Sequence, residues 1–237
     1  MLVTGFPAAA FGTNCYVLAP GAGQECLVVD PGVGVLDRLA EVLREHRLRP
    51  AAVLLTHGHL DHVYSVTPVC GAHDVPALIH GEDAYRLADP ISTLDPSLVG
   101  MLEQQFGSAA AWAEPDDVRT LVDGERLALA GIDLTVQHAP GHTEGSVMFT
   151  VDDVPDGLRV EDAAAPPTAT TLSGDVLFAG SIGRTDLPGG DHAAMLRSLR
   201  DVVLPMPDDR LVLPGHGPAT TIGRERASNP FLLEVAR

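Results

Sequence analysis

The chain of 237 residues is long enough for one large domain or two small ones, and a hydrophobic content of 45% is ample for a packed core. We expect a single domain over residues 1–237. Fifteen arginines and no lysine stand against 32 acidic residues, which gives a formal net charge of −17. This charge argues against a nucleic-acid partner, because nucleic-acid binding depends on cationic neutralisation of phosphates.

Three further features predict where the protein works. The three cysteines are widely spaced and form no CxxC pair, which is typical of reduced thiols in a cytoplasmic protein. The first residues, MLVTGFPAAAFGTN, lack the charged and apolar segments of a signal peptide. No apolar run approaches the roughly 20 residues that a transmembrane helix needs. We therefore expect a cytoplasmic protein with no membrane partner.

The predicted elements alternate between strands and helices along the chain. Apolar residues at helical spacing predict an amphipathic helix from Leu36 to about Arg49, a mostly helical stretch after His62, and a helix over residues 192–204. Apolar runs bounded by Gly and Pro predict strands at residues 14–18, 26–30, 51–56, 77–80, 127–138 with a hairpin turn at Gly131, 146–151, 171–179 as a strand pair, and 210–214 as the final strand. This order predicts an α/β fold with two sheets, each covered on its outer side by helices.

Two segments fall outside the regular elements. Residues 81–117 show an irregular helical pattern and are predicted to form a helical insert near the pocket. In this insert Tyr85, Phe106 and Trp112 are candidates for pocket lining, with core packing as the preferred interpretation. Residues 152–170 are acidic and rich in Pro and Ala, which predicts an exposed mobile loop.

The stretch THGHLDH, residues 56–62, places four metal-capable side chains directly after an apolar run. If the backbone stays extended, the alternation of His57, His59 and Asp61 points all three to the same side, while Asp61 and His62, being adjacent, diverge. Such a group holds one cation between His57 and His59 and offers Asp61 and His62 to another, because imidazole and carboxylate both suit divalent metals.

Later stretches supply further ligand-type side chains, each after a predicted strand and beside a glycine that permits a tight turn. They are His142 in HAPGHTEGS, Asp175 in SGD and His216 in PGHGP. The other histidines, His46, His73, His80, His138 and His192, are interpreted as structural, and Asp30 as a carboxylate that fixes a loop.

The order and context of these residues resemble the metallo-β-lactamase superfamily. Its HxHxDH pattern is met by residues 57–62, its isolated His by His142, its bridging Asp by Asp175 and its final His by His216, together with VVDPG at residues 28–32. The resemblance implies a four-layer αβ/βα sandwich with the site in a cleft between the edges of the two sheets. It also implies that His57, His59 and His142 bind a first metal, that Asp61, His62 and His216 bind a second, and that Asp175 bridges them.

The chemistry implied by the resemblance is that of two divalent metals, with zinc preferred and iron or manganese accepted by the same ligands. Two cations so close together need an anionic bridge, which a carboxylate supplies. The pair lowers the pKa of a bound water to about 7, and the resulting hydroxide is the nucleophile. Asp61 is then a catalytic ligand at the hydroxide site.

Residues 174–191, GDVLFAGSIGRTDLPGGD, resemble the glyoxalase II group and specifically its short single-domain bacterial branch, as does ATTIGRERASNPFL at residues 219–232. This resemblance implies a hydrolase that cleaves a small-molecule thioester, typically S-lactoylglutathione, by attack on the thioester carbonyl and expulsion of a thiolate. An Asp at position 175, where β-lactam-hydrolysing members have Cys or Ser, argues against antibiotic hydrolysis.

The chain departs from full-length glyoxalase II in how it would hold glutathione. Only 21 residues follow His216, so the C-terminal helical domain that holds glutathione in those proteins is not expected here, and the chain has no lysine to bind its carboxylates. Arg184 is a candidate substrate contact, and the alternative is a structural salt bridge with Asp186.

Two other functions remain open from the sequence. A persulfide dioxygenase, which the HxHxDH stretch and GRTD also resemble, would bind a single non-haem iron through His57 or His59, His142 and Asp175. A metal-binding module without catalysis is the third reading. The SIGRTDLPGG stretch favours the hydrolase over the dioxygenase, and seven intact ligands in an open-cleft fold argue against the module without catalysis.

Overall fold

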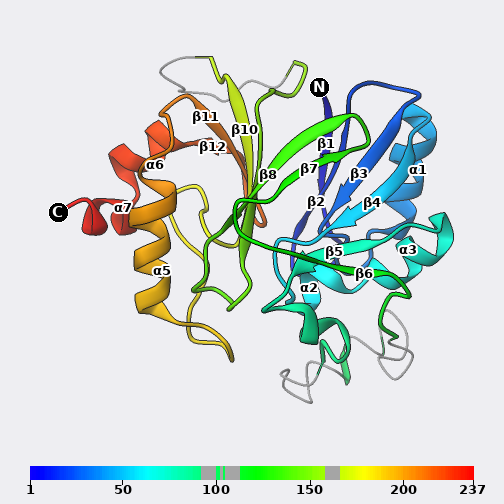
Figure 1. Ribbon diagram of the computed structural model, residues 1–237, viewed down its shortest axis with the longest axis horizontal. Coiled ribbons are helices and arrows are strands. Elements are labelled where there is room, and N and C mark those ends of the chain that lie inside the picture. The colour runs from blue at the N-terminus through cyan, green and yellow to red at the C-terminus, as the bar shows by residue number, and fades with distance from the viewer. Residues whose placement is uncertain (92–99, 102–103, 105–112, 158–165) are drawn as a thin grey trace.

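Two six-stranded sheets face each other in the middle of the molecule (Figure 1). The computed structural model describes residues 1–91, 100–101, 104, 113–157 and 166–237. The N-terminal sheet contains, in spatial order, β1 (Leu2–Pro7), β2 (Asn14–Ala19), β3 (Glu25–Val29), β4 (Arg49–Leu54), β5 (Ala77–His80) and β6 (Val118–Leu121). The C-terminal sheet contains β12 (Thr220–Thr221), β11 (Arg210–Pro214), β10 (Ala169–Gly174), β9 (Val147–Val151), β8 (Ile132–His138) and β7 (Arg126–Leu129).

Both sheets are mixed, and their parallel strands position the functional loops. In the N-terminal sheet β3, β4, β5 and β6 run parallel, whereas β1, β2 and β3 are antiparallel. In the C-terminal sheet β10 and β11 run parallel and the other neighbours are antiparallel. Because parallel strands end at the same edge of a sheet, the loops that follow them lie side by side.

Helices cover the outer face of each sheet, which gives four layers (Figure 1). The N-terminal sheet is covered by α1 (Leu36–His46) and α3 (Val66–His73), and the C-terminal sheet by α5 (His192–Ser198), its π-helical continuation η3 (Leu199–Val203), α6 (Ile222–Ser228) and α7 (Pro230–Val235). The short α2 (Leu60–Val63) and the 3-10 helix η1 (Ala84–Leu87) lie at the edge where the two sheets meet the pocket. The predicted four-layer αβ/βα arrangement is confirmed.

Successive side chains of the central strands point to opposite faces of the sheet, and both faces are buried. In β2, Cys15 and Val17 pack with the helices of the N-terminal layer, while Tyr16 and Leu18 pack between the sheets. A strand side chain points to the face opposite its neighbours, so an unbroken apolar run fills both layers. A third apolar cluster, which includes Met195, joins the C-terminal sheet to its helices.

Several predicted boundaries were wrong, and each has a local cause. Residues 171–179 are not a strand pair, because β10 ends at Gly174, whose φ of +48° turns the chain out of the sheet. Residues 210–214 are not the final strand, since the two-residue β12 pairs with β11. The loop predicted over residues 152–170 is too long, because residues 169–170 are buried in β10.

The insert predicted over residues 81–117 is described only in part. Its described portion contains η1 and helical residues at 100, 101 and 104, and Tyr85 is 57% exposed and lines the pocket instead of packing in the core. Phe106 and Trp112 lie outside the described residues, as do residues 158–165 of the predicted mobile loop.

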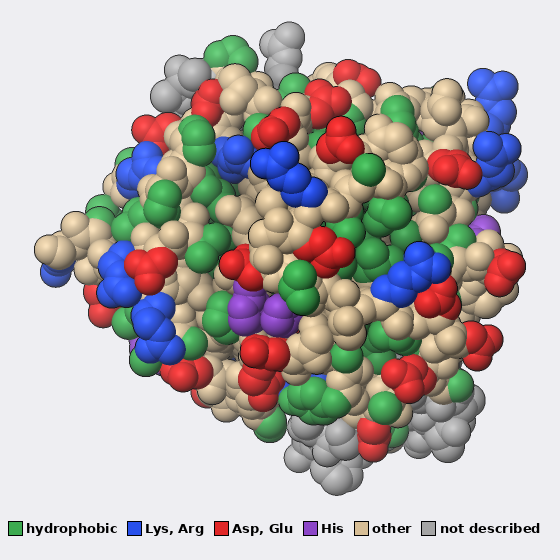
Figure 2. Space-filling view, viewed as in Figure 1, with side chains coloured by type: hydrophobic (Ala, Val, Ile, Leu, Met, Phe, Trp, Pro, Cys, Tyr) green, Lys and Arg blue, Asp and Glu red, His purple; other side chains and the backbone are tan. Residues whose placement is uncertain are grey.

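The surface agrees with the acidic composition. On the face shown in Figure 2, acidic side chains are interspersed with arginines, and the coloured residues there form no continuous basic area. Among the described residues, none of the helices combines the length and the apolar character needed to cross a bilayer.

Candidate metal centre

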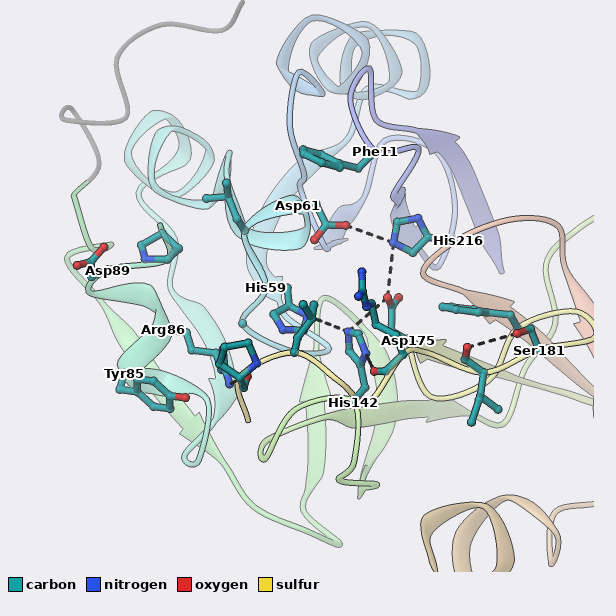
Figure 3. Close-up of a pocket in the computed structure, with 18 residues that line it drawn as sticks. Phe11, His59, Asp61, Tyr85, Arg86, Asp89, His142, Asp175, Ser181 and His216 are labelled. Carbon is teal, nitrogen blue, oxygen red and sulfur yellow. Dashed lines mark hydrogen bonds and ion pairs between the residues drawn. The ribbon is translucent and has the colours of Figure 1, made fainter. Parts of the chain in front are cut away.

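The seven predicted ligands come from four loops at one edge between the sheets. Residues 57–62 follow β4, His142 lies between β8 and β9, Asp175 follows β10, and His216 follows β11. The ends of β10 and β11 are held together by the pairing of Gly174 with Pro214, which brings their two loops into contact. Figure 3 shows those that line the pocket, pointing toward one another: His59, Asp61, His142, Asp175 and His216. The structure therefore brings all seven together.

The first group contains the ligand nitrogens of His57, His59 and His142. The Nε2 atom of His142 lies 3.1 Å from Nε2 of His57 and 2.8 Å from Nδ1 of His59. Two nitrogens on a tetrahedral zinc are separated by roughly 3.3 Å when each Zn–N bond is about 2.0–2.1 Å. The three nitrogens are therefore spaced as ligands of one cation.

Hydrogen bonds on the far side of these rings fix which nitrogen faces the centre. The Thr56 hydroxyl donates to Asp30 Oδ2 at 2.6 Å, so its oxygen accepts from Nδ1 of His57 at 3.1 Å. Likewise Nδ1 of His142 donates to the carbonyl oxygen of Arg184 at 2.7 Å. His57 and His142 thus both turn an Nε2 lone pair toward the centre, where neither can donate to the other, and a cation between them satisfies both.

The second group contains Asp61, His62 and His216. Asp61 Oδ2 lies 3.2 Å from Nε2 of His216 and 3.6 Å from Nε2 of His62. Nδ1 of His62 donates to Asp30 Oδ2 at 2.9 Å, which turns its Nε2 atom inward, and the Thr13 hydroxyl donates to Asp61 Oδ2 at 2.7 Å.

This second group corrects the assumption of an extended backbone. The chain is extended as far as His59, which has φ −70° and ψ 145°, but α2 begins at Leu60. Asp61 therefore leaves the side shared by His57 and His59, and it converges with His62 instead of diverging from it.

Asp175 lies between the two groups. Its Oδ1 atom is 3.3 Å from Nε2 of His62, and its Oδ2 atom is 3.5 Å from Nε2 of both His142 and His216. Nε2 of His62 and Oδ1 of Asp175 are buried polar atoms without a hydrogen-bond partner. Buried polar atoms are normally satisfied, so these two unpartnered atoms fit a site that binds cations.

The electrostatics of the two groups differ. Burial, with nearby imidazoles, holds the pKa of His57 well below its usual range and lowers the pKa of His59 to about 3. In the second group burial disfavours charge on His62, but Asp61 and Asp175 outweigh it and raise the pKa of His62. The first group therefore presents neutral imidazoles, whereas the second demands positive charge, which a proton or a metal ion supplies.

Two buried carboxylates behind the ligands hold the loops in place. Asp30 accepts from Thr56 and His62, as predicted for a carboxylate that fixes a loop. Asp83 was missed by sequence reasoning. It is fully buried and accepts hydrogen bonds from Gly58 N at 2.7 Å and Gly145 N at 2.8 Å, which ties the loop after β4 to the loop before β9. No local pattern marks it, because its partners are distant in sequence.

The pocket above the ligands has a volume of about 680 Å³ and an apolar wall. Arg184 lines it, but both oxygens of the Asp186 carboxylate accept from its guanidinium at 2.7 and 2.8 Å. The wall includes Phe11, Tyr85, Phe178, Ile182, Leu187 and Pro188. The site therefore combines a polar floor with an enclosure suited to a small organic molecule.

Another cluster, His80 with Glu82 and His138, lies outside this centre. The two imidazole rings stack with centroids 4.0 Å apart, and Nε2 of His138 donates to the carbonyl oxygen of Glu144 at 2.8 Å. Because that nitrogen already has an acceptor, the structural interpretation of both histidines fits the geometry.

Comparison with known proteins adds to this description. A model of the metallo-beta-lactamase superfamily matches residues 8–155. An uncharacterized protein of Mycobacterium tuberculosis is 44% identical over 238 residues, covering 100% of both chains. The probable metallo-hydrolase YqgX of Bacillus subtilis and the hydroxyacylglutathione hydrolase GloC of Haemophilus influenzae are each 36% identical, over 95% of this chain and 95% of the relative.

Two solved structures are similar over nearly the whole chain. One is described as BLEG-1 B3 metallo-beta-lactamase, with a TM-score of 0.76 and 34% identity over 98% of this chain and 99% of that one. The other is TTHA1623 in a di-iron-bound form, with a TM-score of 0.72 and 33% identity over 97% of this chain and 100% of that one.

Proposed function

The chain belongs to the metallo-beta-lactamase superfamily, and we propose that it is a metal-dependent hydrolase that cleaves small-molecule thioesters with two divalent cations. The observation that carries the proposal is the pair of three-atom ligand groups with Asp175 between them at the floor of the pocket. His57, His59 and His142 would hold the first cation, Asp61, His62 and His216 the second, and Asp175 would bridge them.

The nature of the donors supports a binuclear centre. Imidazole nitrogens and carboxylate oxygens suit zinc, iron and manganese, of which we prefer zinc. The relative solved in a di-iron-bound form is evidence that a similar chain accepts two metal ions. Bound there, such a pair supplies a water of lowered pKa and polarises a carbonyl oxygen.

The residues of the chain supply orientation and enclosure. The hydrogen bonds of His57 to Thr56, of His62 to Asp30 and of His142 to the Arg184 carbonyl fix the ligand rings before any metal binds. The apolar wall limits the access of water to the floor. A thiolate leaves without first accepting a proton, so a thioester substrate needs little general-acid assistance from the pocket.

A thioester is favoured over other substrates by two lines of support. The GSIGRTD stretch resembles glyoxalase II, and a relative named hydroxyacylglutathione hydrolase shares 36% identity over 95% of the chain. Similarity to a structure described as a B3 metallo-beta-lactamase makes a β-lactam a necessary control substrate. The persulfide dioxygenase alternative requires one iron and oxygen, which a separate assay distinguishes.

The test is metal content per chain, followed by turnover of the same preparation with S-lactoyl thioesters, a cephalosporin and glutathione persulfide. We expect about two metal ions per chain, thioester hydrolysis and no oxygen uptake with the persulfide. His59→Ala and Asp175→Ala should each lose metal and activity, while His73→Ala, an exposed histidine at the end of α3, should retain both. Full turnover by Asp175→Ala, or oxygen consumption with one iron per chain, would contradict the proposal.

A further inference from the structure

The charges around the pocket bear on the thiol that the substrate carries. Glutathione has two carboxylates, and an enzyme that binds it productively needs cations or other donors to receive them. Among the described residues, the arginines that line the pocket are Arg86 and Arg184. The histidines of the lining, His59, His142 and His216, belong to the candidate metal groups.

Arg86 is already neutralised within the protein. Its side chain is buried, and Nη2 donates to Glu144 Oε2 at 2.7 Å and to the carbonyl oxygen of Pro188 at 3.0 Å. Nε lies 3.4 Å from Oδ1 of the buried Asp83. Two carboxylates thus surround one guanidinium, and a third carboxylate brought by a substrate would be repelled rather than bound.

Arg184 is engaged in a similar way but at the surface. Nε and Nη2 of Arg184 donate to the two oxygens of Asp186. This pairing occupies the edge through which a guanidinium binds a carboxylate with two hydrogen bonds. To bind a substrate carboxylate through this edge, Arg184 would first have to release Asp186. The side chain of Asp89 adds a further acidic group to the pocket lining.

The amino-acid sequence directly after Asp89 and Pro90 is also free of basic residues. Residues 92–112, which follow Asp89 and Pro90 of the lining, contain no Arg, Lys or His in the sequence, and the whole chain contains no lysine. Positive charge from bound metal would lie at the floor of the pocket. A carboxylate attracted there would occupy the position that the thioester carbonyl needs.

We propose that the thiol portion of the substrate carries no carboxylates, and that the pocket selects such thioesters over those of glutathione. This inference rests on the proposed thioesterase function. It follows from the apolar wall, from the pairing of Arg86 and Arg184 with carboxylates of the chain, and from the acidic side chain of Asp89, which Figure 3 shows beside the pocket. Together these features offer contact to an uncharged carrier and repulsion to an anionic one.

A matched pair of substrates tests the inference on the metal-loaded protein. S-lactoylglutathione and its diethyl ester have the same acyl group and nearly the same size but differ in their two carboxylates. We expect kcat/KM to be about fivefold or more higher for the diester, mainly through KM. Fivefold corresponds to about 1 kcal/mol, which is the repulsion between two like charges about 4 Å apart in water. Added salt should narrow the difference by screening. S-lactoyl-N-acetylcysteamine serves as a neutral third substrate.

A pair of variants tests the role of the exposed salt bridge between Arg184 and Asp186. Asp186→Asn frees Arg184, and we expect kcat/KM for S-lactoylglutathione to rise about threefold or more while the diester is unchanged. Asp201→Asn is the matched control, since Arg200 and Asp201 form an equivalent exposed pair that does not line the pocket. Asp201→Asn should leave kcat/KM unchanged for both S-lactoylglutathione and its diester.

The outcomes separate this inference from the proposed function. A kcat/KM for S-lactoylglutathione equal to or above that of the diester would overturn the inference while leaving the thioesterase function intact. If metal-loaded protein hydrolysed none of the three thioesters, the proposed function would fall and the inference with it.

Discussion

The buried carboxylate of Asp83 offers the sharpest test of how the fold positions the metal ligands. It accepts hydrogen bonds from Gly58 N, from the Thr143 hydroxyl at 2.7 Å and from Gly145 N, and it lies beside Arg86. Gly58 belongs to the loop that carries two histidines of the first group. Thr143 and Gly145 belong to the loop that carries His142. Replacing Asp83 with alanine should therefore disconnect the two halves of the first ligand group.

The size of the effect can be worked out from these contacts. Each buried donor left without an acceptor costs about 1–3 kcal/mol, and Asp83→Ala leaves the N–H groups of Gly58 and Gly145 in that state, whereas the Thr143 hydroxyl can donate to Ser146 Oγ, 2.8 Å away. Arg86 keeps its hydrogen bonds to Glu144 and to the carbonyl oxygen of Pro188, so its loss of Asp83 adds little to this cost. We expect the free energy of unfolding of the metal-free protein to fall by about 3–5 kcal/mol.

Metal affinity should fall as well, by about 10–100-fold at the first group, which is typical when a group that orients ligands is removed. Denaturant unfolding of the metal-free chain measures the first effect, and chelator competition measures the second. Asp117→Ala, which removes an exposed carboxylate paired with Arg119, is the control and should unfold at the same denaturant concentration as the parent.

A milder substitution tests the same contacts if Asp83→Ala does not fold. Asp83→Asn keeps one acceptor oxygen and should lie between the parent and the alanine variant in both measurements. If Asp83→Ala unfolded at the parent's denaturant concentration and bound both metals with unchanged affinity, the two loops would be positioned by something other than this carboxylate.

Three further predictions follow from the same geometry. Gly215→Ala should abolish metal binding, because a Cβ there would overlap Asp175 Oδ1 and lie 2.8 Å from His62 Cε1. Gly71→Ala, whose Cβ would lie in open space on α3, should bind metal normally. Equal metal content in the two variants would refute this reasoning. Asp30→Asn should weaken the second cation by about 10–100-fold in a titration, since Asp30 orients His62. Burial raises the pKa of all three cysteines, to about 12 for two of them, so iodoacetamide at pH 8 should label none in the native protein and all in denaturant.

The sequence predicts best those features that neighbouring residues determine. The strands β2, β3 and β5 were found because their apolar runs fill both layers, and a fully buried strand carries that signal in its own residues. By contrast β1 and β12 were missed. Strand β1 is mostly half-exposed and contains Gly5, and β12 is two residues long, so each exists because a neighbouring strand offers a pairing edge.

The same distinction applies within the site. The ligand residues were predictable because their types and order are local properties of the chain. The direction in which each points was not, since extended alternation holds only up to His59 and the start of α2 at Leu60 redirects Asp61. Asp83 was invisible because its partners lie 25 and 62 residues away, and no short window of sequence contains both of them.

These observations explain how a chain can hold so many lone pairs close together. His57 and His142 face each other with Nε2 lone pairs 3.1 Å apart, an arrangement that is unfavourable without a cation. Their outer nitrogens are fixed by Thr56 and by the Arg184 carbonyl, and the loops that carry them are joined through Asp83, so packing and hydrogen bonds supply the stability that the bare ligands lack. A bound cation would remove this cost, and the site would not have to be built by the metal.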